Sequence, residues 1–197
     1  MQSAGRVLRQ WALPVVVALA ALILQVTNGS EWARLERDTA LVEPWRLLGA
    51  HFVHLGWIHL WMNLAGLAVL WMLLGDTIRT TLWASGVLFI ALGVSLGLLC
   101  CSPAVAWYVG FSGVLHGLFA AGAVANIRRL PALGSALLIV LTAKLVLEQV
   151  AGGDSLTQGL IGDAVIVDAH LYGAVAGVSY GLLLLVMSPG SSRDRHP

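Results

Sequence analysis

The sequence predicts an all-α fold, in which a single membrane domain over residues 1–197 forms a bundle of six transmembrane helices. Composition is the first reason. Hydrophobic residues make up 58% of the chain and charged residues only 11%, whereas a soluble domain usually carries about 25% charged residues. The mean hydropathy is +0.85, and the apolar residues gather in long stretches. A net charge of +1 without any basic stripe gives no indication of a nucleic-acid partner.

The apolar stretches place the helices, since each lies near the roughly 20 residues that a spanning helix needs. They cover about residues 13–27, 56–74, 81–100, 105–126, 131–150 and 164–187. Arg6 and Arg9 precede the first stretch, and no clear small-residue cleavage site follows it. We therefore expect a retained signal anchor. A polar segment, residues 28–51, separates the first stretch from the second.

The other boundaries carry residues that stop helices or lie at membrane surfaces. These are Gly75-Asp76, Ser102-Pro103, Arg128-Arg129, Pro131, the Gly/Asp-rich connection over residues 152–163, and Pro189. Between the third and fourth helices, we expect irregular backbone over residues 102–110. Such backbone is tolerated at membrane depth only where it lines a water-filled cavity or is buried in protein.

The basic residues predict the orientation, because cytoplasmic loops are enriched in arginine and lysine. With both termini inside, the cytoplasmic side holds Arg6, Arg9, Arg79, Arg128, Arg129, Arg193 and Arg195. The outer side then holds Arg34, Arg37 and Arg46, diluted among acidic residues. This topology places the polar segment and the start of the sixth helix on the outer side.

Polar side chains cluster at one predicted depth near the outer side, where they are costly and usually functional. They are His54, His59 and Asn63 on the second helix, Ser112 and His116 on the fourth, and His170 on the sixth. The pairs His59/Asn63 and Ser112/His116 are each spaced i,i+4, so each shares one helix face. The shared depth predicts a functional site between these helices.

Ser112 has the features of a nucleophile, and His170 is the expected general base because it faces Ser112 from another helix. Close approach of those two helices needs small residues, which Gly113, Gly173 and Gly177 supply. A tetrahedral oxyanion would also need hydrogen-bond donors. The Ser112 amide, the His59 imidazole and the Asn63 amide are the candidates.

A third member of a catalytic triad is not evident. Asp168 is two residues before His170, so on a helix it points roughly 200° away. We therefore expect a Ser–His dyad. Lys144 and Glu148, spaced i,i+4 on the fifth helix, are interpreted as a neutralising pair near its outer end. A part in substrate recognition is the alternative for that pair.

These residues resemble the motifs of the rhomboid intramembrane serine proteases. The similarity consists of four motifs in order: Trp45-Arg46, His54-x4-His59-x3-Asn63, Gly110-x-Ser112-Gly113, and Ala169-His170-x-x-Gly173-x-x-x-Gly177. The resemblance implies a Ser112 nucleophile, a His170 base, and an oxyanion hole made by His59, Asn63 and the Ser112 amide. We expect Trp45 and Arg46 to anchor the first loop at the headgroup level, and His54 to hold that loop.

Many rhomboids carry a tyrosine one turn below the serine, where this chain has His116. This residue and the short six-helix form are similar to the rhombosortase branch. That resemblance implies membrane-anchored protein substrates whose C-terminal tail has a Gly-Gly motif, a membrane helix and a basic end. It also implies the bacterial inner membrane, with a site that opens to the periplasmic side and needs no metal or cofactor.

Three alternatives stay open from the sequence. The histidines also suit a metal- or haem-binding membrane protein, although the chain has no HExxH motif. A catalytically inactive relative could act as a binding scaffold. Within a protease, His116 could replace His170 as the base, although side chains spaced i,i+4 on one helix leave little room for a substrate carbonyl. The oligomeric state does not follow from the sequence.

Overall fold

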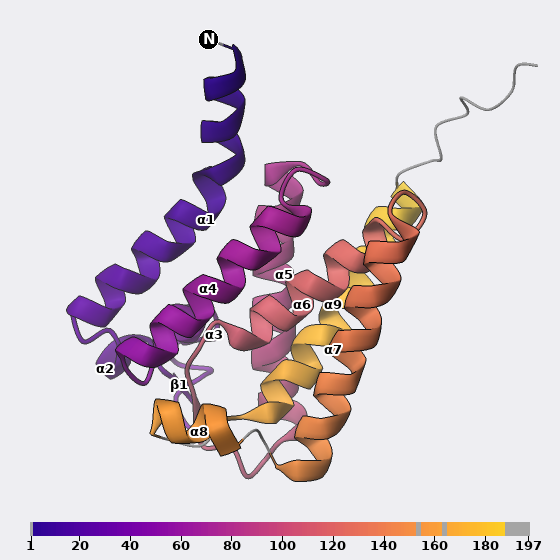
Figure 1. Cartoon of the computed structure of the whole chain (residues 1–197). Coiled ribbons are helices and arrows are strands. Elements are labelled where there is room, and N and C mark those ends of the chain that lie inside the picture. The colour runs from indigo at the N-terminus through magenta and orange to yellow at the C-terminus, as the bar shows by residue number, and fades with distance from the viewer. Residues whose placement is uncertain (1, 153–154, 163–164, 188–197) are drawn as a thin grey trace, which may run out of the picture.

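The computed structural model describes residues 2–152, 155–162 and 165–187 (Figure 1). Its long helices are α1 (Gln2–Val26), α4 (Trp57–Leu74), α5 (Thr80–Cys101), α6 (Ser112–Ala125), α7 (Pro131–Ala151) and α9 (Val167–Met187). The short elements are α2 (Ser30–Ala33), β1 (Leu35–Glu36), α3 (Arg46–Gly49), the 3₁₀ turn η1 (Ala50–Phe52), β2 (Trp107–Tyr108) and α8 (Ser155–Ile161). The predicted helical class is confirmed, with one two-residue strand pairing added to it.

The described residues contain 4 helices that are long and apolar enough to cross a membrane, namely α4, α5, α7 and α9. The apolar part of α1, Gln10–Val26, is shorter. Helix α6 has 14 residues, and at 1.5 Å per residue it is about 21 Å long, less than the roughly 30 Å of a hydrocarbon core. The chain is therefore a multi-pass membrane protein, while the predicted count of six full spans is not confirmed.

Helix α6 begins later than the sequence predicts, at Ser112 and not near residue 105. The preceding residues form β2, which pairs antiparallel with β1 so that Tyr108 lies opposite Leu35. Gly110 then adopts a φ of +122°, a conformation that favours glycine and cannot continue a helix. This agrees with the irregular backbone expected over residues 102–110.

The connection predicted over residues 152–163 also differs, because it contains α8, which contacts α4 (Figure 1). The sixth predicted helix corresponds to α9, which begins at Val167. The earlier start predicted at residue 164 falls outside the described residues.

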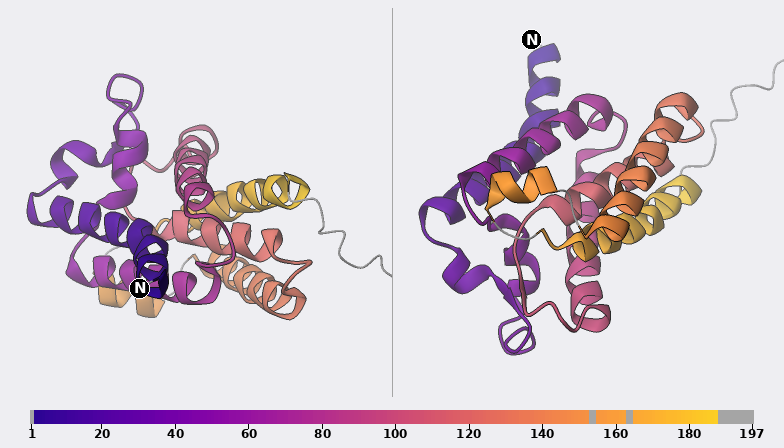
Figure 2. Two further views of the ribbon diagram at one scale, coloured as in Figure 1. Left: turned by 90° about the horizontal axis from the view of Figure 1, so that it is seen from above. Right: turned by 60° about the horizontal axis from the view of Figure 1, so that its bottom comes forward.

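Helix α6 lies in the middle of the bundle, in contact with α4, α5, α7 and α9 (Figure 2). Its tightest neighbour is α9. A Cβ on Gly113 would lie 2.8 Å from the carbonyl oxygen of Ala169, and one on Gly117 would lie 2.5 Å from that of Gly173. A Cβ on Gly177 would overlap the carbonyl of Gly117. The small-residue contact predicted between these helices is confirmed, and it brings their backbones together.

The polar segment after α1 is fixed to the C-terminal end of α5 by Arg37. Its guanidinium donates hydrogen bonds of 2.6 to 3.0 Å to the carbonyl oxygens of Leu98, Leu99, Ser102 and Val105. The last carbonyls of a helix lack intrahelical donors and carry partial negative charge, so the partly buried guanidinium of Arg37 satisfies both needs. Arg37 thereby fixes the start of the segment that leads to Ser112.

Helix α7 is the most exposed of the four helices that are long and apolar enough to span a membrane, because only 17% of its apolar stretch is buried inside the protein. Figure 2 shows it at the edge of the bundle, beside α6 and α9. Its buried residues are Gly134, which packs against α6, and Glu148. A buried acid on an otherwise lipid-facing helix needs partners, and these lie in the candidate site.

Candidate active site

Ser112 is the first residue of α6, and the loop before it is held in place by hydrogen bonds. The Gly110 N–H donates to the carbonyl oxygen of Ala50 at 3.0 Å, and the buried Tyr108 hydroxyl donates to the carbonyl of Gly110 at 2.7 Å. Because Ser112 is the first helical residue, its own N–H has no intrahelical acceptor. That N–H is therefore available to a ligand.

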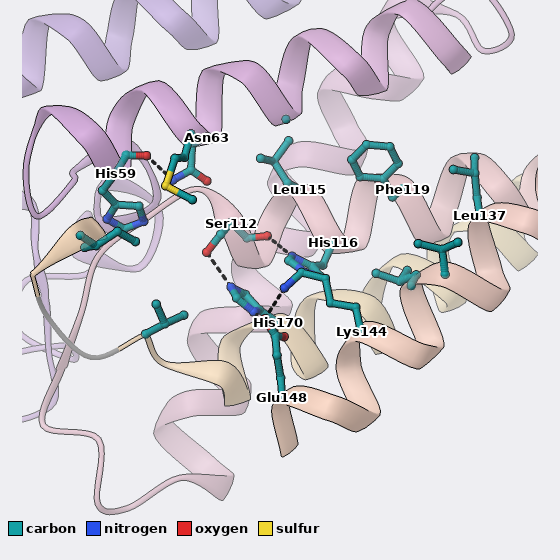
Figure 3. Close-up of a pocket in the computed structure, with 16 residues that line it drawn as sticks. His59, Asn63, Ser112, Leu115, His116, Phe119, Leu137, Lys144, Glu148 and His170 are labelled. Atoms are coloured by element: carbon teal, nitrogen blue, oxygen red, sulfur yellow. Dashed lines mark hydrogen bonds and ion pairs between the residues drawn. The ribbon is translucent and has the colours of Figure 1, made fainter. Parts of the chain in front are cut away.

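The hydroxyl of Ser112 meets the imidazole of His170, as the sequence predicts (Figure 3). Ser112 Oγ and His170 Nε2 are 2.8 Å apart. His170 lies in the first turn of α9 and is 4% exposed. The glycine contacts between α6 and α9 set this separation, since Gly113 and Gly173 each lie within one turn of the residue that they help to place.

The opposite nitrogen of His170 contacts a carboxylate. His170 Nδ1 lies 2.8 Å from Glu148 Oε2, so the expectation that His170 would have no acidic partner is wrong. The partner is not the neighbouring Asp168, which bonds to the Ser102 hydroxyl as its opposite direction on the helix requires. The partner comes from α7, so the spacing of residues along α9 gives no indication of it.

Glu148 is shared between two partners. Its Oε1 atom pairs with the ammonium of Lys144, one turn earlier on α7, while Oε2 contacts His170. The Glu148 side chain is 6% exposed and that of Lys144 is 47% exposed. The expected Lys144–Glu148 pair is confirmed, and it extends to the imidazole that contacts Ser112.

His116 packs on His170 face to face, with ring centroids 4.1 Å apart and planes inclined by 11°. Its Nδ1 lies 2.7 Å from the backbone carbonyl of Ser112. A carbonyl oxygen can only accept, so Nδ1 carries the proton of a neutral His116. His116 thus contacts the backbone of Ser112, whereas the imidazole of His170 contacts the Ser112 hydroxyl.

His59 and Asn63 line the same cavity from α4 (Figure 3). His59 Nδ1 accepts a hydrogen bond from the Leu55 N–H at 3.4 Å, which leaves Nε2 as the protonated donor of the neutral ring. A Cβ on Gly110 would lie 3.1 Å from His59 Nε2 and 4.0 Å from Ser112 Oγ, so both groups border Gly110. Asn63 Nδ2 donates to the His59 carbonyl at 2.9 Å, and its second N–H remains free for a ligand.

Two cavities flank Ser112, and both are lined by Ser112 and His59. The larger, of about 360 Å³, extends between α4, α6 and α7 and is lined mainly by apolar side chains such as Met62, Phe119 and Leu141. The smaller, of about 250 Å³, lies on the side of residues 104–109. The serine hydroxyl therefore sits between an apolar space and one bordered by loop backbone.

Trp45, Arg46 and His54 hold the loop around the site and do not contact Ser112. Trp45 Nε1 donates to the carbonyl of Trp32 at 3.0 Å, and Arg46 pairs with Glu43. The His54 ring packs edge-on against His59 with centroids 5.0 Å apart. Burial lowers the pKa of His54 to about 3, which keeps it neutral beside His59. The supporting roles that the sequence predicts for these three residues stay predictions.

The cluster also has the composition of a possible metal site. His116, Glu148 and His170 each offer one ligand atom within 4.8 Å of the others. However, both His170 nitrogens already have partners in Ser112 and Glu148, and the protonated His116 nitrogen faces a carbonyl. A metal ion would have to displace those contacts.

A family model described as Rhomboid domain matches residues 42–187. The matched region includes all of the site residues described above. A comparison with curated proteins found no match.

Proposed function

The chain belongs to the rhomboid family, an intramembrane protease family, and on that premise we propose that it is a serine endopeptidase that cleaves membrane-anchored proteins within the bilayer. The observation that carries the proposal is the 2.8 Å contact between Ser112 Oγ and His170 Nε2. Both atoms border a largely apolar cavity inside a multi-pass helical bundle. A serine with an imidazole at hydrogen-bond distance is the arrangement that nucleophilic acyl transfer requires.

In the proposed reaction, Ser112 Oγ attacks the scissile carbonyl carbon while its proton passes to His170 Nε2. The carbonyl oxygen becomes an oxyanion, which the Ser112 N–H, the His59 Nε2–H and the Asn63 amide stabilise. Each such donor contributes about 3 kcal/mol to transition-state stabilisation. His170 then protonates the leaving amine, and the resulting acyl-enzyme is hydrolysed by a water that His170 deprotonates.

The length of α6 supports a site below the membrane surface. Arg128 and Arg129 follow its C-terminal end, where a positively charged turn suits the cytoplasmic interface. Ser112, at the other end, would then lie about 9 Å below the outer surface, since α6 is about 21 Å long in a core of roughly 30 Å. This depth suits the end of a substrate's membrane helix, and we take the loop-side cavity as the route by which water would enter.

The proposed substrates are proteins with a C-terminal sorting tail made of a Gly-Gly motif, a membrane helix and a basic end. The rhombosortase-like pattern around Ser112 and His116 supports this narrower assignment. As part of this assignment we also propose a bacterial inner-membrane location, cytoplasmic termini and a site that opens to the periplasmic side.

Co-expression with a tail-anchored reporter tests the proposal. The wild type should release the reporter, and Ser112→Ala should insert normally and leave the reporter uncut. Changing the Gly-Gly motif to Val-Val tests the substrate class separately. Cleavage by Ser112→Ala at the wild-type rate would refute the proposed mechanism.

The metal-binding alternative retains one observation in its favour, the cluster of His116, Glu148 and His170. Metal content and the visible spectrum of the purified protein distinguish the two functions. Stoichiometric metal or a haem band that disappears in His170→Gln would favour the alternative. A metal-free preparation that cleaves the reporter favours the protease. A metal-free preparation that neither cleaves substrates nor reacts with serine-directed probes would favour the scaffold.

A further inference from the structure

Glu148 is the one buried acid among the described residues of α7, and it lies on the far side of His170 from Ser112. Figure 3 shows the three side chains in a row, each from a different helix. Burying a carboxylate is costly unless it is paired and hydrogen-bonded. Neither the family match nor the four sequence motifs assign it a role. Its position suggests more than a link between helices.

We propose that Glu148 is the positioning residue that completes a Ser112–His170–Glu148 triad, an inference that rests on the proposed protease function. A carboxylate oxygen can only accept a hydrogen bond, so the 2.8 Å contact places the proton on His170 Nδ1. A neutral ring with a proton on Nδ1 has its lone pair on Nε2. Nε2 then faces the Ser112 hydroxyl as an acceptor, which is the tautomer that a general base needs.

The proton balance of this arrangement is simple. The Ser112 proton moves to Nε2 as the Oγ–carbon bond forms, and the ring becomes an imidazolium with protons on both nitrogens. Glu148 keeps its negative charge throughout and lies against the positive ring. The Nε2 proton leaves with the amine, so Glu148 exchanges no proton in the cycle.

Lys144 explains how the carboxylate can stay charged at this position. Its ammonium binds Oε1, the oxygen that His170 does not use. The Lys144 side chain is 47% exposed and lines the same cavity as Glu148, where its positive charge neutralises the buried acid. The pair therefore brings no net charge to the cavity and still leaves one carboxylate oxygen on the imidazole.

The competing explanation is that Glu148 serves only to neutralise Lys144 and to hold α7 against α9. The two explanations differ for variants that remove both charges. A neutralising pair can be replaced by two uncharged residues without loss, as often happens for buried ion pairs. A positioning carboxylate cannot be replaced in this way, because the ring would lose the negative charge beside it, and a glutamine could turn its NH2 group toward Nδ1 and favour the wrong tautomer.

Kinetics in detergent micelles with a fluorogenic transmembrane peptide provide the first test. Glu148→Gln should lower kcat by on the order of 10² to 10⁴ and leave KM within about threefold. Glu148→Asp should retain more activity than Glu148→Gln. The double variant Glu148→Gln/Lys144→Met should remain as slow as Glu148→Gln. The matched control Glu31→Gln, which changes an exposed acid on α2, should match the wild type.

Wild-type kcat in Glu148→Gln, or recovery of kcat in the double variant, would overturn the inference. Nitrogen NMR of histidine-labelled wild type gives a test that does not depend on activity or on the folding of Glu148 variants, with His170→Gln used to assign the signal. We expect a neutral ring with a proton on Nδ1. A bare Nδ1 would overturn the inference. An inactive wild type that shows the Nδ1–H tautomer would instead count against the protease function.

Discussion

A Cβ on Gly173 would overlap the carbonyl oxygen of Gly113. The two glycines lie beside the reacting residues, because Gly113 follows Ser112 and Gly173 is three residues after His170. No larger side chain fits without moving α6 from α9. The separation between nucleophile and base therefore depends on backbone-to-backbone contact more than on the two side chains themselves.

We expect Gly173→Ala to separate the two helices and to lose activity. Overpacking of this kind costs about 1 to 3 kcal/mol of stability, and a shift of even about 1 Å at the site costs on the order of 10² in rate. Melting temperature in detergent and reporter cleavage measure the two effects. Gly159→Ala is the matched control, because a Cβ there meets nothing within 4 Å. Full activity in Gly173→Ala would show that the close approach is not required.

Asn63→Ala should lower kcat by on the order of 10² to 10³ and change KM little, because an oxyanion donor acts in the transition state. The Asn63 N–H that bonds to the His59 carbonyl makes a contact only within α4, so Asn63→Ala should still fold. Steady-state kinetics with the same peptide measure this effect. A rise in KM at unchanged kcat would instead assign Asn63 to substrate binding.

Variants of His116 distinguish a role in stacking on His170 from a role as the general base. His116→Phe keeps a flat ring over His170 but cannot accept a proton, whereas His116→Ala removes the stack. We expect His116→Phe to retain at least about a tenth of wild-type kcat, since aromatic stacking is worth only about 1 kcal/mol, and to exceed His116→Ala. If both variants were as inactive as His170→Gln, His116 would have to be the base.

Acid should destabilise the protein through His51, which is fully buried on the loop beside α5. Its Nε2 lies 3.0 Å from Ser95 Oγ, and that hydroxyl donates to the carbonyl of Leu47. The other nitrogen has no partner among the described residues. Burial lowers the pKa of His51 to about 4, so only the unfolded chain binds a proton between about pH 6.5 and pH 4.

The stability from His51 is therefore complete above pH 6.5 and falls as pH drops toward 4, by about 3 kcal/mol in all. Melting curves in detergent from pH 7.5 to 4.5 should show this decline. His51→Gln cannot titrate there and should flatten the profile, whereas removing the exposed Asp76 carboxylate should leave its slope unchanged. An identical slope in His51→Gln would contradict the assignment.

Much of this site follows from sequence, because its members share helix faces and depth. The i,i+4 spacings place His59 with Asn63 and Ser112 with His116, and the glycines predict that α6 and α9 touch. Glu148 does not follow in the same way, since its partner His170 is 22 residues away on another helix. The available signal was a carboxylate near the C-terminal end of an apolar helix, at the depth that the sequence predicts for His170.

Hydropathy alone also does not predict the late start of α6 or the presence of α8. Residues 105–111 are apolar enough to read as helix, but Gly110 with its positive φ and the β1–β2 pairing decide their conformation. That pairing joins segments about 70 residues apart, so no local pattern records it. Helix α8 lies in a Gly/Asp-rich segment whose composition indicates a loop.

The most direct test of the central claim is labelling of the purified protein with a fluorophosphonate, followed by peptide mapping of the modified residue. If His170 activates Ser112, the wild type should be labelled on Ser112, and labelling should be lost in Ser112→Ala and be strongly reduced in His170→Gln. A preparation that cleaves the reporter but carries no label on Ser112, or carries it on another residue, would contradict the account.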